Sequence, residues 1–238
     1  MTADSHGKIT EEKLEKLRKH LGEAQPNLQA FVSEASIDTI RHWADGIGTD
    51  NPLYTDESYA EQGPYGEMVA PPTFLFAASR YTSGFVRGLK GVHTLYGGTE
   101  WTWHQPIRRG MRIRTETTLS DVTEQDSSFS GTAVQQMYTT EFETDDGRPI
   151  ATADSWTFRV EREQATENKK YSDEGGSRTA DWDKSDIQRF AEHYRNEEPR
   201  GNNPRYVEDV AEGDELDTLL KGPTSVTGGI TFIQGWGG

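Results

Sequence analysis

The hydrophobic pattern of this chain changes once, near Gly91, from a helical period to a period of two. Before that point, residues 72–88 are apolar on nearly every side at their start, which is typical of a buried helix. After it, four stretches alternate in polarity or carry β-branched and aromatic residues, and turn-forming residues separate them, as in strands. These stretches are residues 93–103, 112–121, 129–144 and 150–161. The pattern predicts an α+β fold in which an antiparallel meander wraps one buried helix.

Shorter helices are predicted on both sides of this unit. Residues 9–22 and 34–46 are amphipathic and end at a glycine, and Ser36 is a suitable cap for the second helix. Residues 56–62 and 184–195 predict two more short helices. The chain then divides into a helical extension (1–33), a main domain (34–161), a polar linker with a short helix (162–205) and a separate segment (206–238).

Composition excludes several kinds of partner and site. The 238 residues include no cysteine, which removes disulfides, thiolate nucleophiles and cysteine-based metal sites, and the six histidines show no metal-binding spacing. A net charge of −15 argues against nucleic acid as a partner, because phosphate binding needs a positive surface. No apolar run has the length of a membrane span, and the N-terminus lacks the apolar core of a signal peptide. We therefore expect a cytoplasmic protein with no metal and no membrane partner.

Two motifs give the chain a family resemblance. The loop GTDNPLYTD at 48–56 and the block MVAPPTF at 68–74, with the strand segment at 98–114, resemble the MaoC-like (R)-specific enoyl-CoA hydratases and dehydratases, and in particular an N-terminal half of the FAS1-like dehydratase type. The resemblance implies a hot-dog fold over about residues 34–160. It also implies an α,β-unsaturated acyl-CoA substrate, no cofactor beyond the CoA of the substrate, and a second hot-dog subunit as partner. Segment 206–238 resembles the start of a second hot-dog that stays incomplete.

The resemblance also indicates that the catalytic motif is degraded. In the family the motif reads Gly-Asp-any-Asn-Pro-aliphatic-His, and the Asp and His activate the water that adds to the β-carbon. Aligned on its Asn-Pro pair, this sequence has Thr49 at the Asp position and Tyr54 at the His position. A threonine hydroxyl is no base near pH 7, and a tyrosine with a pKa of about 10 replaces His poorly. The helix-start amide that would hold the thioester oxygen falls near Pro71, which has no N–H.

The expected function is therefore the acyl-binding, non-catalytic half of an acyl-CoA hydratase or dehydratase. Three alternatives stay open: an active hydratase that uses Asp50, a hot-dog acyl-CoA thioesterase, and an acyl-binding scaffold. Tyr54 either lines the acyl pocket or packs in the core. The substrate-binding candidates are Asn51, Tyr54, Pro71, Pro72, Thr73 and Phe74. The candidates for contact with CoA phosphates are Arg108, Arg109 and Arg112, for which a solvated turn is the alternative.

Overall fold

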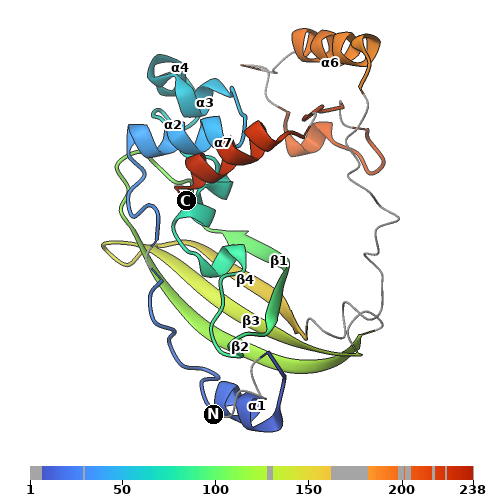
Figure 1. Ribbon diagram of the computed structural model, residues 1–238. Coiled ribbons are helices and arrows are strands. Elements are labelled where there is room, and N and C mark those ends of the chain that lie inside the picture. The colour runs from blue at the N-terminus through green and yellow to red at the C-terminus, as the bar shows by residue number, and fades with distance from the viewer. Residues whose placement is uncertain are drawn as a thin grey trace.

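The computed structural model describes residues 7–28, 30–127, 131–161, 182–197, 201, 205–215, 218–222 and 224–237. Four long antiparallel strands form one curved sheet (Figure 1). The strands are β1 (His93–Trp103), β2 (Ile113–Ser127), β3 (Gly131–Thr144) and β4 (Pro149–Val160). The predicted antiparallel sheet is confirmed, and its first strand has the predicted bounds. The strand predicted from residue 129 begins at Gly131, because residues 128–130 lie outside the described residues.

The strand order is β1-β4-β3-β2, so only the last three strands form a meander. The prediction of one continuous meander was wrong for β1, which pairs with β4 and not with β2. The connection from β1 to β2 explains this order. It crosses to the helical layer, where the backbone N–H of Ala70 donates to the carbonyl of Ile107 at 2.8 Å and Val69 bridges to Arg108. The two strands therefore lie at opposite edges of the sheet.

The prediction of one buried helix over residues 72–88 was wrong. The segment forms two short 3-10 helices, η2 (Pro72–Ala77) and η3 (Tyr81–Ser83), and then leaves the sheet. Gly84 follows with a φ of 82°, and a Cβ there would lie 2.9 Å from the ring of Tyr96, so a continuous helix is broken at that point. The first half is buried as predicted, whereas Phe85 is 44% exposed.

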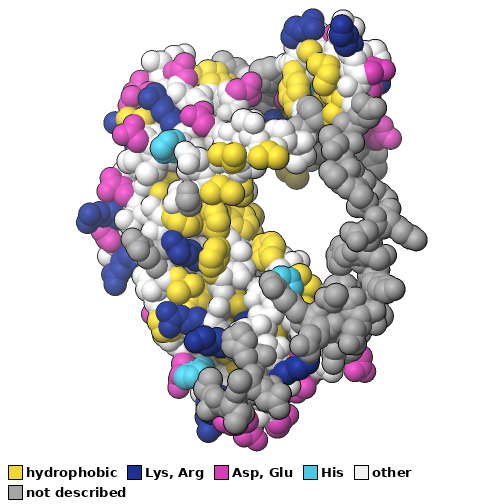
Figure 2. All heavy atoms as spheres, in the orientation of Figure 1, with side chains coloured by type: hydrophobic (Ala, Val, Ile, Leu, Met, Phe, Trp, Pro, Cys, Tyr) yellow, Lys and Arg dark blue, Asp and Glu magenta, His cyan; other side chains and the backbone are white. Residues whose placement is uncertain are grey.

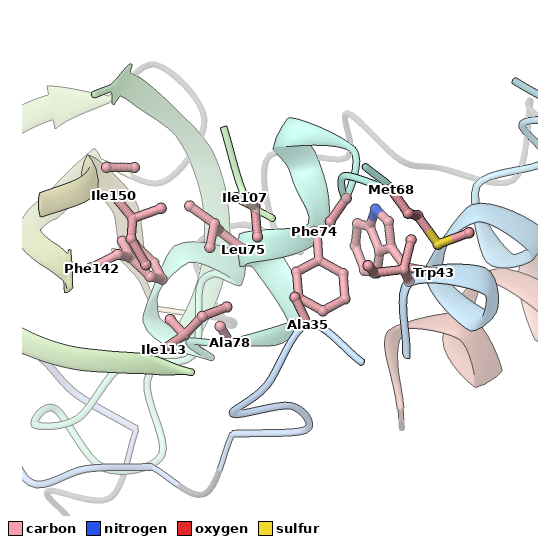
Figure 3. Packing of buried hydrophobic residues seen from close by; sticks show 14 of the residues in the cluster. Ala35, Trp43, Met68, Phe74, Leu75, Ala78, Ile107, Ile113, Phe142 and Ile150 are labelled. Atoms are coloured by element: carbon pink, nitrogen blue, oxygen red, sulfur yellow. The ribbon is translucent and has the colours of Figure 1, made fainter. Parts of the chain in front are cut away.

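The buried half of this segment supplies the centre of the main core. Phe74 packs against Trp43 with ring centroids 6.5 Å apart, and Leu75 lies on the side of the sheet residues Phe142 and Ile150 (Figure 3). All of these side chains are at most 2% exposed. The core therefore joins the sheet to the helices above it through η2.

The N-terminal extension closes the other end of the sheet. Helix α1 (Glu11–Arg18) begins at the cap Thr10 and buries Leu14 and Leu17 in a second core cluster. That cluster includes Tyr81 from η3 and Tyr138 from β3. The extension predicted from the sequence is thus packed on the main domain.

A buried polar network fixes the backbone that follows η3. The guanidinium of Arg159, on β4, donates to the carbonyls of Leu89 at 2.7 Å and Val92 at 3.1 Å, and to the amide oxygen of Gln136 at 2.9 Å. The amide nitrogen of Gln136 donates to the hydroxyl of Tyr138 at 3.0 Å, and burial raises the pKa of that hydroxyl to about 12. These bonds hold the irregular segment at residues 89–92, just after the predicted helix, against the sheet.

The remaining helices lie at one end of the sheet, where α6 (Lys184–Asn196) stands apart from the layer that the others form (Figure 1). Ser36 caps α2 as predicted, since its hydroxyl accepts from the N–H of Thr39 at 3.2 Å. The helices are α2 (Ile37–Gly46), α3 (Pro52–Thr55), α4 (Glu57–Glu61), α6 (Lys184–Asn196) and α7 (Val226–Trp236). Helix α3 was expected to be a loop, and α7 was expected to belong to a strand-and-turn segment.

The C-terminal segment is not confirmed as the start of a second hot-dog. Its described part, residues 205–215, 218–222 and 224–237, contains the 3-10 turn η5 (Val207–Asp209) and α7, and no strand. Residues 162–181 of the predicted linker, together with Leu216 and Gly238, lie outside the described residues. Helix α7 packs on α2 instead, so the segment folds back onto the main domain.

Candidate acyl-binding site

The motif loop is built around the cap of helix α3. The side-chain oxygen of Asn51 accepts from the N–H of Leu53 at 3.1 Å, and Pro52 occupies the first helical position, where a missing N–H has no cost. The hydroxyl of Thr49 lies 3.4 Å from the N–H of Asn51. Thr49 and Asn51 therefore shape the turn, while Asp50 next to them is exposed.

Tyr54 leaves this turn toward the protein interior. Its side chain is half-buried and packs against the main core. Burial, and to a smaller extent the neighbouring Tyr65, raises the pKa of Tyr54 above its ordinary value. The hydroxyl is therefore protonated near pH 7, so it can donate a hydrogen bond but cannot take a proton from water.

A pocket of about 380 Å³ opens beside Tyr54, between the motif loop, the start of η2 and the end of β1. Its volume lies in the range of small-ligand sites. Trp103 forms part of the wall, where its indole N–H donates to the carbonyl of Pro72 at 3.3 Å and its ring stacks on Trp101 at 5.6 Å. The lining residues are Leu53, Tyr54, Tyr65, Val69, Ala70, Pro72, Trp103, His104, Gln105, Pro106 and Ile107. The wall is mostly apolar and aromatic, and it has one imidazole.

The start of η2 offers this pocket no amide donor at residues 70–72. The N–H of Ala70 is bound to Ile107, and the next two residues, Pro71 and Pro72, have no N–H. The sequence prediction placed the missing donor near Pro71, and the structure extends the gap to three consecutive positions. A thioester oxygen at this point would find no backbone hydrogen bond from these residues.

The sequence of residues 27–153 matches the family described as "FAS1-like, dehydratase domain region". The match covers more than half of the chain. The chain belongs to this family. It is a FAS1-like dehydratase domain with the hot-dog fold, as the motifs indicated.

The chain is also similar to two named relatives and to a solved structure. The chain is 31% identical over 94 residues to a UPF0336 protein of Streptomyces avermitilis, a match that covers 37% of this chain and 63% of that protein. It is 28% identical over 134 residues to UPF0336 protein SCO4636 of Streptomyces coelicolor, covering 54% of this chain and 85% of that protein. A similar solved structure is the ChsH1-ChsH2 complex from Mycobacterium tuberculosis, with a TM-score of 0.52 and 16% identity over 63% of this chain and 92% of that chain. At this identity the likeness shows the fold.

The substrate-binding residues predicted for this FAS1-like dehydratase domain divide into two groups. Tyr54 and Pro72 line the pocket. Pro71 and Phe74 are buried in the structure, Thr73 accepts the indole N–H of Trp43 at 3.2 Å, and Asn51 caps α3.

Sequence reasoning missed the opposite wall of the pocket. Tyr65, Trp103, His104 and Gln105 come from two segments about forty residues apart, and the β1-to-β2 crossover brings them together. The adjacent Trp103 and His104 before Pro106 were the available signal. A hydrophobic period of two predicts that such residues lie on a strand. It does not predict which residues of other segments lie opposite them.

The predicted phosphate-binding arginines lie at the outer side of the same crossover. Arg108 pairs with Glu67 at 2.6 Å, Arg109 pairs with Glu57, and Arg112 lies 3.7 Å from Glu34 and 3.8 Å from Asp145. All three are at least partly exposed, so these pairs contribute little stability and a phosphate could displace the carboxylates. Contact with CoA phosphates stays a prediction.

A larger groove lies at the opposite end of the sheet. It measures about 1490 Å³ and runs between α1 and residues 87–90, and none of the predicted site residues line it. Within the described ranges, no three His, Asp or Glu side chains are placed to hold a metal ion. Among the helices that the structure describes, none is long and apolar enough to cross a membrane.

Proposed function

We propose that this chain is the acyl-binding half of an acyl-CoA hydratase or dehydratase and that a second hot-dog supplies the catalytic groups. One observation carries the proposal: the pocket beside the motif loop is present, but the acid/base positions of the motif hold Thr49 and Tyr54, of which Tyr54 lines the pocket. Neither hydroxyl is ionised near pH 7, so neither can act as the base that activates a water. In this proposal the site binds an acyl group and orients it, and the partner supplies the groups that transfer protons.

The apolar wall suits the acyl part of an α,β-unsaturated thioester. The rings of Tyr54 and Trp103 provide flat apolar surface, and a protonated Tyr54 hydroxyl can donate to a substrate carbonyl. In the reaction that the family performs, a water adds to the β-carbon while an acid and a base move its protons. In this proposal the Asp and His that do so belong to the partner.

The free edge of β1 is the proposed contact with that partner. β1 lies at the edge of the sheet, and among the described residues no strand pairs with its outer side. Leu95, Tyr96 and Trp103 on this strand are exposed, and Figure 2 shows hydrophobic side chains gathered over the middle of one face of the molecule. Open edges and apolar patches of this kind are pairing surfaces. The similar ChsH1-ChsH2 structure is itself a complex of two chains, which supports this arrangement.

A charge on the β1 edge is expected to weaken this association. We predict that Leu95→Lys lowers the affinity for a second hot-dog at least tenfold, which corresponds to about 1.4 kcal/mol. Light scattering at increasing concentration, alone and with a catalytically complete MaoC-like hydratase, measures it. Val207→Lys is the matched control, because Val207 is 82% exposed in η5 and lies outside β1. A wild-type chain that stays monomeric under both conditions would exclude the partner.

A chain that is active alone is the second candidate, and His104 is the observation that favours it. His104 lines the same pocket as Tyr54 and could act as a base there. Asp50, the residue first considered, is exposed and is not among the lining residues. A thioesterase is less supported, because residues 72–88 contain no Asp or Glu to act on the thioester.

Binding of a saturated acyl-CoA, which cannot be hydrated, tests the acyl-binding role directly. We expect the wild-type chain to bind it in a calorimetric titration, and Trp103→Ala and Tyr54→Ala to weaken binding about tenfold or more through lost apolar contact. Trp182→Ala removes an exposed tryptophan outside the pocket and serves as the control. Equal affinity in all four proteins would show that the acyl group binds elsewhere.

A further inference from the structure

Helix α7 lies along α2 in the layer above the sheet (Figure 1). Their closest approach is at Gly46 and Gly235. A Cβ added at Gly46 would lie 2.7 Å from the Cα of Gly235, and a Cβ added at Gly235 would lie 2.5 Å from the Cα of Gly46. The two backbones are therefore in direct contact, and only glycine at both positions permits it.

The two helices carry the same local motif at one constant spacing of 189 residues, from Ser36 to Ser225. Each serine caps its helix, because its hydroxyl accepts from the N–H three residues later, at 3.2 Å in α2 and 3.0 Å in α7. Ten residues after each cap stands the contact glycine. Two residues further, Gly48 and Gly237 both adopt a left-handed φ, of 65° and 96°. Cap, contact glycine and exit turn are thus repeated in order.

The contacts between the helices join equivalent positions. Gly46 meets Gly235, and Trp43, seven residues after its cap, meets Phe232, seven residues after its own, with ring centroids 6.2 Å apart. In a two-fold interface both partners present the same surface, and residues next to the axis contact their own equivalents. The pair α2–α7 therefore has the form of a two-fold helix pair within one chain.

We propose that the face of α2 that contacts α7 is a two-fold pairing site for helices of the α2 type. Helix α7 repeats the α2 motif and occupies this site within the same chain. It therefore excludes helix α2 of a second protein molecule. The inference goes beyond the proposed function, because it holds whether or not the chain supports hydration. It assigns the α2 face to pairing of like helices and leaves the β1 edge for a different hot-dog.

Trp236 explains why α7 is retained in preference to a second copy. Its indole N–H donates to the carbonyl of Phe76 at 2.9 Å, and its ring packs on Phe31 at 4.9 Å and on Phe85 at 5.7 Å. The equivalent position of α2 is Ile47, which has no N–H to donate from its side chain and packs against the core of its own unit. A helix supplied by another chain would lack the indole contact.

Two glycine variants of the full chain separate this proposal from a merely structural role of α7. Gly235→Val and Gly46→Val place the same bulk into the same contact, and neither glycine has a positive φ that would strain valine. Both are expected to displace α7, seen as lost hydrogen-exchange protection over residues 226–236. Only Gly235→Val leaves the α2 face with its own Gly46, so only this variant can pair through α2.

We expect Gly235→Val to gain a concentration-dependent dimer in light scattering and Gly46→Val to gain none. Leu95→Lys is added to both variants, so that pairing through the β1 edge does not contribute to the dimer. The β1 contact of the proposed function is tested by Leu95→Lys alone, so the two proposals can fail independently. Equal self-association of the two variants would indicate general exposure of apolar surface and overturn the proposal. Absence of the dimer in Gly235→Val, or full protection of α7 in that variant, would overturn it as well.

Discussion

The purified chain alone should hydrate a trans-2-enoyl-CoA no faster than buffer does. A positioned general acid or base contributes ~10²–10⁴-fold to such a reaction, and both motif positions lack one. Thr49 is engaged in the turn, and burial keeps the pKa of Tyr54 above its ordinary value. Loss of the conjugated double bond, followed by ultraviolet absorbance, measures the rate, and release of free thiol detects a thioesterase in the same sample.

Variants of this chain identify the source of any activity that is found. Turnover that Asp50→Ala abolishes would show that the motif turn uses its exposed carboxylate, and turnover that His104→Ala abolishes would assign the base to the pocket wall. Restoring the family pattern with Thr49→Asp and Tyr54→His is expected to give little activity, because residues 70–72 offer no free amide for the thioester oxygen. A large gain would show that another group serves as the oxyanion donor.

The second large effect concerns the segment that replaces the expected helix. We predict that Phe74→Ala lowers the free energy of unfolding by about 3–5 kcal/mol, because a fully buried ring leaves a cavity between the sheet and α2. Urea unfolding followed by circular dichroism measures it.

Phe85→Ala is the matched control, since it makes the same change in the same segment. Phe85 is 44% exposed, so we expect a loss of about 1 kcal/mol or less. Similar losses for the two variants would mean that residues 72–88 are buried along their whole length, as a continuous core helix would be.

The sequence predicted the sheet better than the segment beneath it. Strand β1 has the predicted bounds because its aromatic and β-branched residues lie between turn-forming residues, and Ser36 caps α2 because capping depends on neighbouring residues alone. The apolar pattern of residues 72–88 predicts that their side chains are buried. It does not distinguish one continuous α-helix from two short 3-10 helices. The left-handed glycines at 84 and 88 interrupt a longer helix. Tyr96 packs close to Gly84, and Arg159 holds the backbone at Leu89.

Of the two walls of the pocket, the sequence predicted the one formed by the motif loop and missed the opposite one. Tyr54 could be found because it replaces a motif residue, and the motif carries its own spacing. Trp103 could be placed on a strand and Tyr65 in no element, but neither could be placed beside Tyr54. They meet it through the crossover of the chain from β1 to β2, and sequence periodicity carries no information on strand order. The pairing of α7 with α2 was missed for a related reason. Along the aligned stretch only the caps and two glycines are identical, so the repeat becomes visible through its contacts.

The measurement that tests the account most directly is the hydration rate of an enoyl-CoA by a hot-dog subunit that carries the complete Asp and His motif, with and without this chain. We predict that the mixture is faster than the sum of the two separate rates, and that Trp103→Ala and Leu95→Lys in this chain each remove the gain. A rate equal to the sum, or a full rate from this chain alone, would contradict its assignment as an acyl-binding half.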